Sequence, residues 1–312
     1  MLYVSTRNNI DSFTAYRTLH EDHAPDGGMF VPMRFPAFSQ LDLDRFLTAT
    51  FGDTVASVLN LFFPADLTGW DIDSCIGRHP FKLVNKSHKL IIAELWHNHE
   101  LIYDYLEERI YKKLCLGEVI HRHPTASAKI AIRIAVLCGV WGEVMTTESS
   151  PVDIAVMTGD DSAFIAAWYA KRMGLPIGKI ICSCQDNGLL WDLVRRGEVN
   201  ISTSQNEIPA YLERLIFDVF GLNETKNFLN ASGARRSLQA NDRLGELSNA
   251  VFASVIGENR TDSLTSSIFR SCGYVADRSV ALSFGGLQNY RAQSGCSNLT
   301  VLLSQNSVSQ RS

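Results

Sequence analysis

The side chains best suited to chemistry lie in a short glycine loop between two apolar segments. Residues 153–175 read DIAVMTGDDSAFIAAWYAKRMGL, in which a strand-like run leads into the loop and then into a helix-like run. Loops of this kind bind anions, because their backbone N–H groups and the N-terminus of the next helix favour negative charge. Here two carboxylates occupy the loop, which disfavours an anion. The loop residues are Thr158, Gly159, Asp160, Asp161 and Ser162.

Two interpretations of these carboxylates stay open. Acidic residues at the start of a helix complement the helix dipole and accept hydrogen bonds from its free N–H groups, so Asp160 and Asp161 can serve as a simple helix cap. Alternatively, the two carboxylates hold a cation or an amine ligand, since oxygen ligands suit hard cations. The helix cap is the simpler interpretation, and we favour it.

The histidines offer a second chemical grouping. His97 and His99 lie in HNHE, His121 and His123 lie in HRH, and the two groups flank the segment 101–115. Four imidazoles can form a transition-metal site if the two groups come together. About 15 residues of helix between them would hold them near 22 Å apart unless the chain doubles back. We therefore favour surface or packing histidines and keep the metal site as the alternative.

The composition is that of an ordinary globular protein. The chain has 312 residues, of which 46% are hydrophobic and 20% charged, with a formal net charge of −4. This charge gives no reason to expect nucleic acid or an anionic membrane as a partner, and no apolar run approaches the roughly 20 residues of a membrane span. The opening MLYVSTRNNIDSF lacks the pattern of a signal peptide. The seven cysteines are scattered, so we expect reduced thiols in a cytoplasmic protein.

The elements that must position the loop follow a strand, helix, strand order. VDIAVM and GKIICSC are apolar enough to be strands buried on both faces, and AFIAAWYAKRMG between them has helical spacing. Short links in this order predict parallel pairing through a crossover helix. Helices are also predicted over 101–115 and 125–145. We predict an α/β fold with a mainly parallel sheet flanked by helices, and a small, mostly helical N-terminal domain (1–85) before the α/β core domain (86–312).

Several stretches, taken together and in order, resemble threonine synthases, which are pyridoxal-phosphate (PLP) enzymes of fold type II. YVSTR and APDGGMFVP are similar to the family's opening domain, and AELWHNHELIYDYL is similar to its ELFHGPTLAFKD motif. MTGDDSAFIAAWYAKRMGLP resembles the family's PTGNFGNILAGYYAKKMGLP, and CGYVADRSVALS resembles a segment near its C-terminus. The resemblance implies that the sheet is a remnant of the large domain of these enzymes.

The departures from the family pattern fall on its cofactor site. Asp104 stands where the family has the lysine that forms the Schiff base with PLP. In the phosphate loop, Ser162 replaces a glycine, and Asp160 and Asp161 would repel a phosphate by on the order of 3 kcal/mol each at about 5 Å. The family's TAHPAKF is replaced by SQNSVSQ, and the small domain that closes over the substrate has no counterpart in 105–120.

These losses predict a truncated, divergent family member that no longer uses PLP, with no confident catalytic residue. We expect a pseudoenzyme with a binding or scaffolding role, whose partner is another protein, a second copy of the chain or a small amino-acid-like ligand. One alternative is an enzyme with a repurposed cleft, metal-dependent or cofactor-independent, that acts on a small amino-acid-like or phosphorylated metabolite. Another is residual binding of the family's amino-acid ligands. If activity remains, the resemblance implies a lyase.

Overall fold

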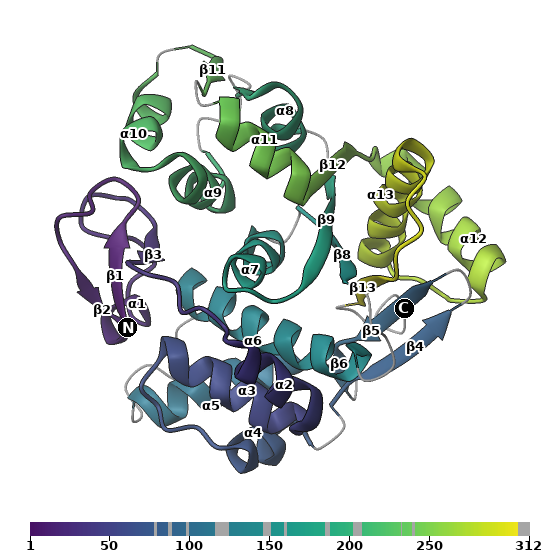
Figure 1. Cartoon of the computed structure of the whole chain (residues 1–312), viewed down its shortest axis with the longest axis horizontal. Helices are drawn as coiled ribbons and strands as arrows, with labels where there is room; N and C mark the ends of the chain where they lie inside the picture. Colours follow the sequence, from purple (N-terminus) through teal and green to yellow (C-terminus); the bar gives the residue numbers. More distant parts are fainter. Residues whose placement is uncertain are drawn as a thin grey trace.

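The backbone is laid out in Figure 1, which shows a computed structural model of the chain. The structure describes residues 1–77, 80–86, 89–97, 100–115, 125–145, 151–158, 161–184, 188–201, 208–231, 233–238 and 241–304.

The N-terminal region combines a small antiparallel sheet, in the order β2-β1-β3, with a group of helices. Ser39, Thr50 and Thr68 each cap the helix that follows, because each side chain accepts the N–H of the residue three positions on. Asp42 and Asp71 complete capping boxes with Ser39 and Thr68. The elements are β1 (Leu2–Ser5), β2 (Phe13–Thr14), α1 (Ala15–Thr18), β3 (Phe30–Pro32), α2 (Gln40–Thr48), α3 (Phe51–Phe62) and α4 (Gly69–Ile76).

The centre of the molecule is a six-stranded sheet in the order β12-β9-β8-β13-β5-β4. All neighbouring strands pair in parallel except β4, which runs antiparallel to β5. This confirms the predicted α/β class and the parallel pairing of the two strands on either side of the glycine loop. The strands are β4 (Lys82–Lys86), β5 (Leu90–Glu94), β8 (Val152–Met157), β9 (Ile177–Cys184), β12 (Val251–Val255) and β13 (Thr300–Ser304).

Helices cover both faces of this sheet. In Figure 1, α12 and α13 lie on one side of the strands, and α6 and α7 lie on the other. The remaining short strands form two small pairs, β6 with β7 and β10 with β11. These elements are α5 (Ile102–Cys115), α6 (Ala126–Met145), α7 (Asp161–Arg172), α8 (Leu189–Arg196), α9 (Ala210–Phe220), α10 (Leu222–Asn230), α11 (Asn241–Ala250), α12 (Thr261–Cys272), α13 (Arg278–Ser294), β6 (Trp96–His97), β7 (Glu100–Leu101), β10 (Glu198–Asn200) and β11 (Arg235–Ser237).

Two hydrophobic cores result, one on each face of the sheet. Successive side chains of a strand point to opposite faces, so Ile154 and Val156 of β8 join the core under α6 and α7, whereas Ala155 joins the core under α13. Ile180 and Ile181 divide in the same way on β9. The predicted burial of these strands on both faces is therefore confirmed. The first core continues into the N-terminal helices, and the predicted domain boundary at 85/86 falls within β4 and stays a prediction.

Helix α13 packs closely against β9 at Gly286. A Cβ on Gly286 would lie 2.2 Å from Ser183 Oγ. The hydroxyl of Ser183 donates a hydrogen bond to the carbonyl of Leu282 at 2.8 Å, which fixes the helix to the strand. Cys182 and Cys184, on either side of Ser183, face the opposite core as buried thiols.

Helix α6 is packed at similarly short range against the N-terminal helices. A Cβ on Gly142 would lie 2.2 Å from the backbone oxygen of Phe46, at α2, and one on Gly139 would lie 2.5 Å from the ring of Phe51, in α3. The two glycines are one turn apart on α6, so their common face lets α2 and α3 approach the helix backbone directly.

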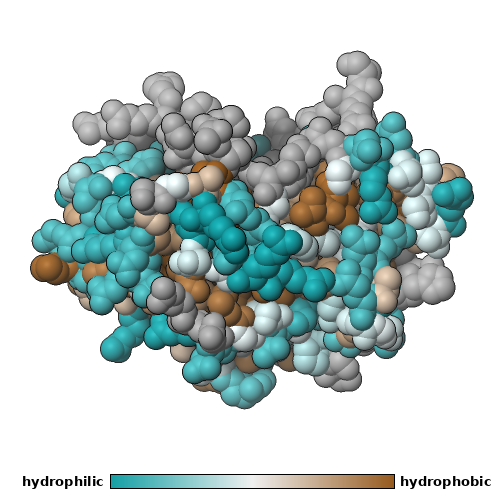
Figure 2. Space-filling view, turned by 90° about the horizontal axis from the view of Figure 1, so that it is seen from above, coloured by the Kyte–Doolittle hydropathy of each residue, from teal (hydrophilic) through white to brown (hydrophobic). Residues whose placement is uncertain are grey.

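Among the described residues, no helix is both long and apolar enough to cross a membrane. The face of the molecule in Figure 2 is mainly hydrophilic, with hydrophobic residues in separate areas. Most of the apolar residues therefore lie in the two cores, as expected for a sheet covered by helices.

Candidate functional site

The carboxyl ends of the parallel strands form the edge of the sheet at which α/β proteins bind their ligands. Helix α7 follows β8 through the glycine loop, and α5 follows β5 through the β6–β7 pair. The fold therefore brings the predicted residues Thr158, Ser162 and Asp104 to this one edge, although they come from distant parts of the sequence. The strands end there at Glu94, Met157, Cys184, Val255 and Ser304.

Asp104 lies in the first turn of α5 and is exposed. The helix start is fixed by the N–H of Ile102, which donates to the carbonyl of Leu95 at 3.1 Å, directly after β5. The neighbouring Tyr103 is buried, and the guanidinium of Arg133 from α6 lies 4.6 Å from the centre of its ring. The site thus presents a carboxylate at this helix start, held by a well-packed backbone.

The glycine loop is described only at its two ends. The N–H of Thr158 donates to the carbonyl of Ser183 at 3.0 Å, which continues the pairing of β8 with β9. Ser162 is buried in the first turn of α7. Gly159, Asp160 and the side chain of Asp161 lie outside the described residues, so both interpretations of the two carboxylates stay predictions.

The histidine grouping lies almost wholly outside the described residues. His97 is on β6, where its backbone pairs with Glu100, and its side chain is not described. No part of His99, His121 or His123 lies within the described residues. Among the side chains that are described, no cluster of three or more His, Cys, Asp or Glu is placed to hold a metal ion. The predicted histidine site is not tested by this result.

A polar cluster at the same edge was not predicted from the sequence. The Tyr274 hydroxyl donates to Glu94 Oε1 at 2.9 Å, and the Ser304 hydroxyl donates to Asp277 Oδ2 at 3.1 Å. Asp277 Oδ1 also accepts the N–H groups of Ser279 at 2.6 Å and of the next residue, which caps α13. Burial raises the pKa of Tyr274, and the bond to Glu94 raises it further, so the phenol stays a donor.

A second polar cluster anchors the helix that carries Asp104. Asp71 on α4 accepts hydrogen bonds from Arg109 Nη2 and Lys113 Nζ of α5, both at 2.7 Å, and from the N–H of Thr68 at 2.9 Å. The bond from Lys113 is the largest cause that holds the pKa of Asp71 well below its usual value. This cluster joins α5 to the N-terminal helices.

Replacing Asp71 by asparagine should lower the free energy of unfolding by roughly 1–2 kcal/mol at neutral pH, because two partly buried cations lose their anion. A lowered carboxyl pKa contributes stability that is fully present above the unfolded value of about 4 and is lost as the pH falls through the folded value. Urea unfolding at pH 7 and pH 3 should therefore show a smaller difference between wild type and Asp71→Asn at pH 3. The control is Asp44→Asn on the exposed face of α2. An equal loss in both variants would contradict the anchoring role.

Comparison with known proteins places a family match on the N-terminal region and finds relatives over short stretches of the chain. The family described as "Threonine synthase N terminus" matches residues 2–79. Threonine synthase-like 1 of Homo sapiens is 42% identical over 52 residues, which is 17% of this chain and 7% of that protein. Threonine synthase of Corynebacterium glutamicum is 26% identical over 110 residues, which is 32% of this chain and 23% of that protein. The matches thus span less than a quarter of the length of either relative.

Solved structures extend the likeness to the whole fold. The chain superposes on PLP-bound threonine synthase from Brucella melitensis with a TM-score of 0.82 at 17% identity, covering 99% of this chain and 89% of that one. Threonine synthase from yeast gives a TM-score of 0.78 at 15% identity, with 98% and 87% covered. At these identities the superpositions establish a shared architecture.

Proposed function

We propose that this chain, whose N-terminal region matches the threonine synthase N-terminus family and whose fold superposes on threonine synthases, is a pseudoenzyme, a binding protein that has lost PLP-dependent catalysis. The observation that carries this proposal is Asp104 at the start of α5. PLP enzymes hold the cofactor through a lysine amine, and a carboxylate cannot form that bond.

The residues at this edge do not fit the cofactor. Asp104 offers a negative charge in place of an amine, and the lysines further along α5 have other partners. Lys112 pairs with Glu108, and Lys113 pairs with Asp71. The lost lysine is therefore not replaced from the same helix.

The polar cluster supports a binding role on a retained scaffold. The hydroxyls of Tyr274 and Ser304 donate to Glu94 and Asp277. The polar groups at the ends of β5 and β13 therefore pair with one another and stabilise the fold. The carboxylates of Glu94 and Asp104 favour cationic groups over anionic ones. An amine-bearing, amino-acid-like metabolite is the ligand class that we favour.

Incubation of the wild-type protein with PLP should give no aldimine absorbance band. After borohydride reduction, peptide mapping should find no stoichiometric adduct on any lysine, because no amine occupies the start of α5. A threonine synthase that binds PLP, treated in the same way, should show the band and one labelled lysine, which demonstrates that the assay detects such a site.

A stoichiometric adduct in the wild-type protein, fixed to one lysine, would contradict the proposal. Calorimetric titration with threonine and with homoserine tests the small-ligand role. Saturable heat that Asp104→Asn diminishes supports the small ligand, and no heat with either amino acid would count against it.

A further inference from the structure

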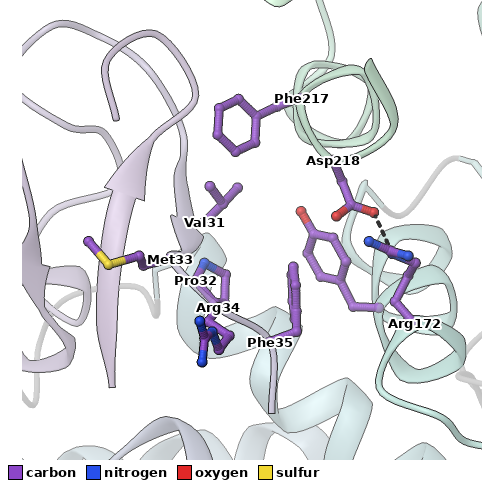
Figure 3. Close-up of a pocket in the computed structure, with 9 residues that line it drawn as sticks. Val31, Pro32, Met33, Arg34, Phe35, Arg172, Phe217 and Asp218 are labelled. Atoms are coloured by element: carbon purple, nitrogen blue, oxygen red, sulfur yellow. Dashed lines mark hydrogen bonds and ion pairs between the residues drawn. The ribbon is translucent and has the colours of Figure 1, made fainter. Parts of the chain in front are cut away.

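A pocket of about 390 Å³ lies far from the sheet edge, between β3, α7 and α9 (Figure 3). One wall is apolar and consists of Val31, Pro32 and Phe35 from β3 and the chain after it, together with Phe217 from α9. In Figure 3, Val31 and Phe217 point toward each other across one end of the pocket. The volume is within the usual range of small-molecule sites.

The other wall carries charge. Arg172, at the end of α7, donates through Nε to Asp218 Oδ2 at 3.2 Å, and Figure 3 shows the two side chains facing each other. Trp168 Nε1 donates to the same oxygen at 2.7 Å. Asp218 is therefore already compensated, whereas the two terminal Nη groups of Arg172 have no acceptor among the described residues. Its side chain is 54% exposed, so these groups are accessible.

Between the two walls lies a buried hydroxyl whose hydrogen bonding is incomplete. Tyr169 is 2% exposed, and its hydroxyl has no hydrogen-bond partner within the part of the chain that the structure describes. Buried hydroxyls are almost always paired, so an unpaired one marks a place where a partner belongs. Burial, followed by the charge of Asp218, raises the pKa of Tyr169, which keeps the group protonated and able to donate. The ring of Phe35 lies 4.4 Å from its ring and fixes its orientation.

The charged residues that line the pocket favour an anionic ligand. Arg34 and Arg172 against Asp218 leave one net positive charge on the lining. With an apolar wall opposite, the surroundings suit a molecule with one negative group and a hydrophobic body.

We propose that this pocket binds a small monocarboxylate with an apolar body. The carboxylate accepts hydrogen bonds from Arg172 and from the Tyr169 hydroxyl, and the body packs between Val31, Phe35 and Phe217.

This site is separate from the edge that carries Asp104. Tyr169 and Arg172 belong to the last turn of α7, about 12 Å and 17 Å along the helix from its first residue at the glycine loop. The proposal therefore does not depend on the proposed function. A bound molecule would contact both the N-terminal sheet and α9, and so would join two parts of the fold.

Phenylacetate is a suitable probe, and isothermal titration calorimetry on the full chain is the test. We expect saturable 1:1 binding, with phenylacetamide at least tenfold weaker because it lacks the charge. Tyr169→Phe and Arg172→Gln should each weaken phenylacetate about tenfold. The control is Arg270→Gln, which removes an exposed arginine on α12 and should leave binding unchanged.

A melting measurement distinguishes binding from a structural role. Tyr169→Phe removes a hydroxyl without a described partner, so its melting temperature should equal or exceed that of the wild type while its affinity falls. The proposal is overturned if phenylacetate does not saturate, if phenylacetamide binds equally well, or if Tyr169→Phe binds like the wild type.

Discussion

Replacing Gly142 by alanine should lower the free energy of unfolding by about 3 kcal/mol. The added Cβ would lie 2.2 Å from the backbone oxygen of Phe46, a distance that real Cβ atoms do not show. Because the contact is with backbone and not with a flexible side chain, relief requires α2 to move away from α6. That movement would open the first core beside Phe46, which is itself buried.

The matched control is Gly245→Ala on α11, where an added Cβ meets nothing within 4 Å. Alanine is the better helix former by up to about 1 kcal/mol, so this variant should be as stable as the wild type or more stable. Urea unfolding followed by circular dichroism measures both. If the two variants shift the unfolding midpoint in the same direction, close approach of α2 and α6 is not what requires glycine at position 142.

Loss of the Glu213 carboxylate should lower the free energy of unfolding by a similar amount. Glu213 is 1% exposed on α9 and accepts hydrogen bonds from Arg7 Nε at 3.1 Å, Arg7 Nη2 at 3.0 Å and the hydroxyl of Thr6. The hydrogen bond to Glu213 is also the largest cause that raises the pKa of Arg7. Glu213→Gln removes the charge and one acceptor oxygen, so a half-buried guanidinium loses its hydrogen-bonded anion and keeps only the weaker attraction of Asp26. We expect a loss of about 3 kcal/mol.

Urea unfolding of Glu213→Gln, beside Glu246→Gln on the exposed face of α11, tests this expectation. The second variant makes the same chemical change without a buried partner and should alter stability by less than about 0.5 kcal/mol. Limited proteolysis should also cut Glu213→Gln first in its N-terminal segment, because Thr6 and Arg7 attach that segment to α9. Equal stability of the two variants would show that the buried ion pair contributes little.

The sequence was most informative where one segment is buried on all sides. The run 152–184 predicted β8, α7 and β9 and their parallel pairing, because continuous apolar strands around an apolar helix fit only a covered sheet. The edge strands β4 and β12 were missed. KLVNK in β4 is mostly polar because only one side of an edge strand has a neighbour, and VFASV in β12 is too short to show a period.

The two sites differed in how far the sequence could predict them. Asp104 and the glycine loop were found because they stand in local motifs. The cluster of Glu94, Tyr274 and Ser304 was not, since its members come from different elements and meet only when β5 and β13 pair. Tyr169 looked like one more apolar residue of a buried helix. Whether its hydroxyl is paired depends on the residues that pack against α7, and those residues come from distant parts of the sequence.

The two-core construction has a consequence for how this protein changes over evolutionary time. The strand interiors divide their side chains between two cores, whereas the chemistry sits on the loops and helix starts beyond the strand ends. Mutations in the loops at that rim therefore change what the protein binds or transforms at a smaller loss of stability than mutations in the cores, and selection on folding removes them less readily. Mutations in the cores beneath α6 or α13 are removed quickly by selection on folding. A lineage with this architecture can lose one activity and acquire another while its fold persists.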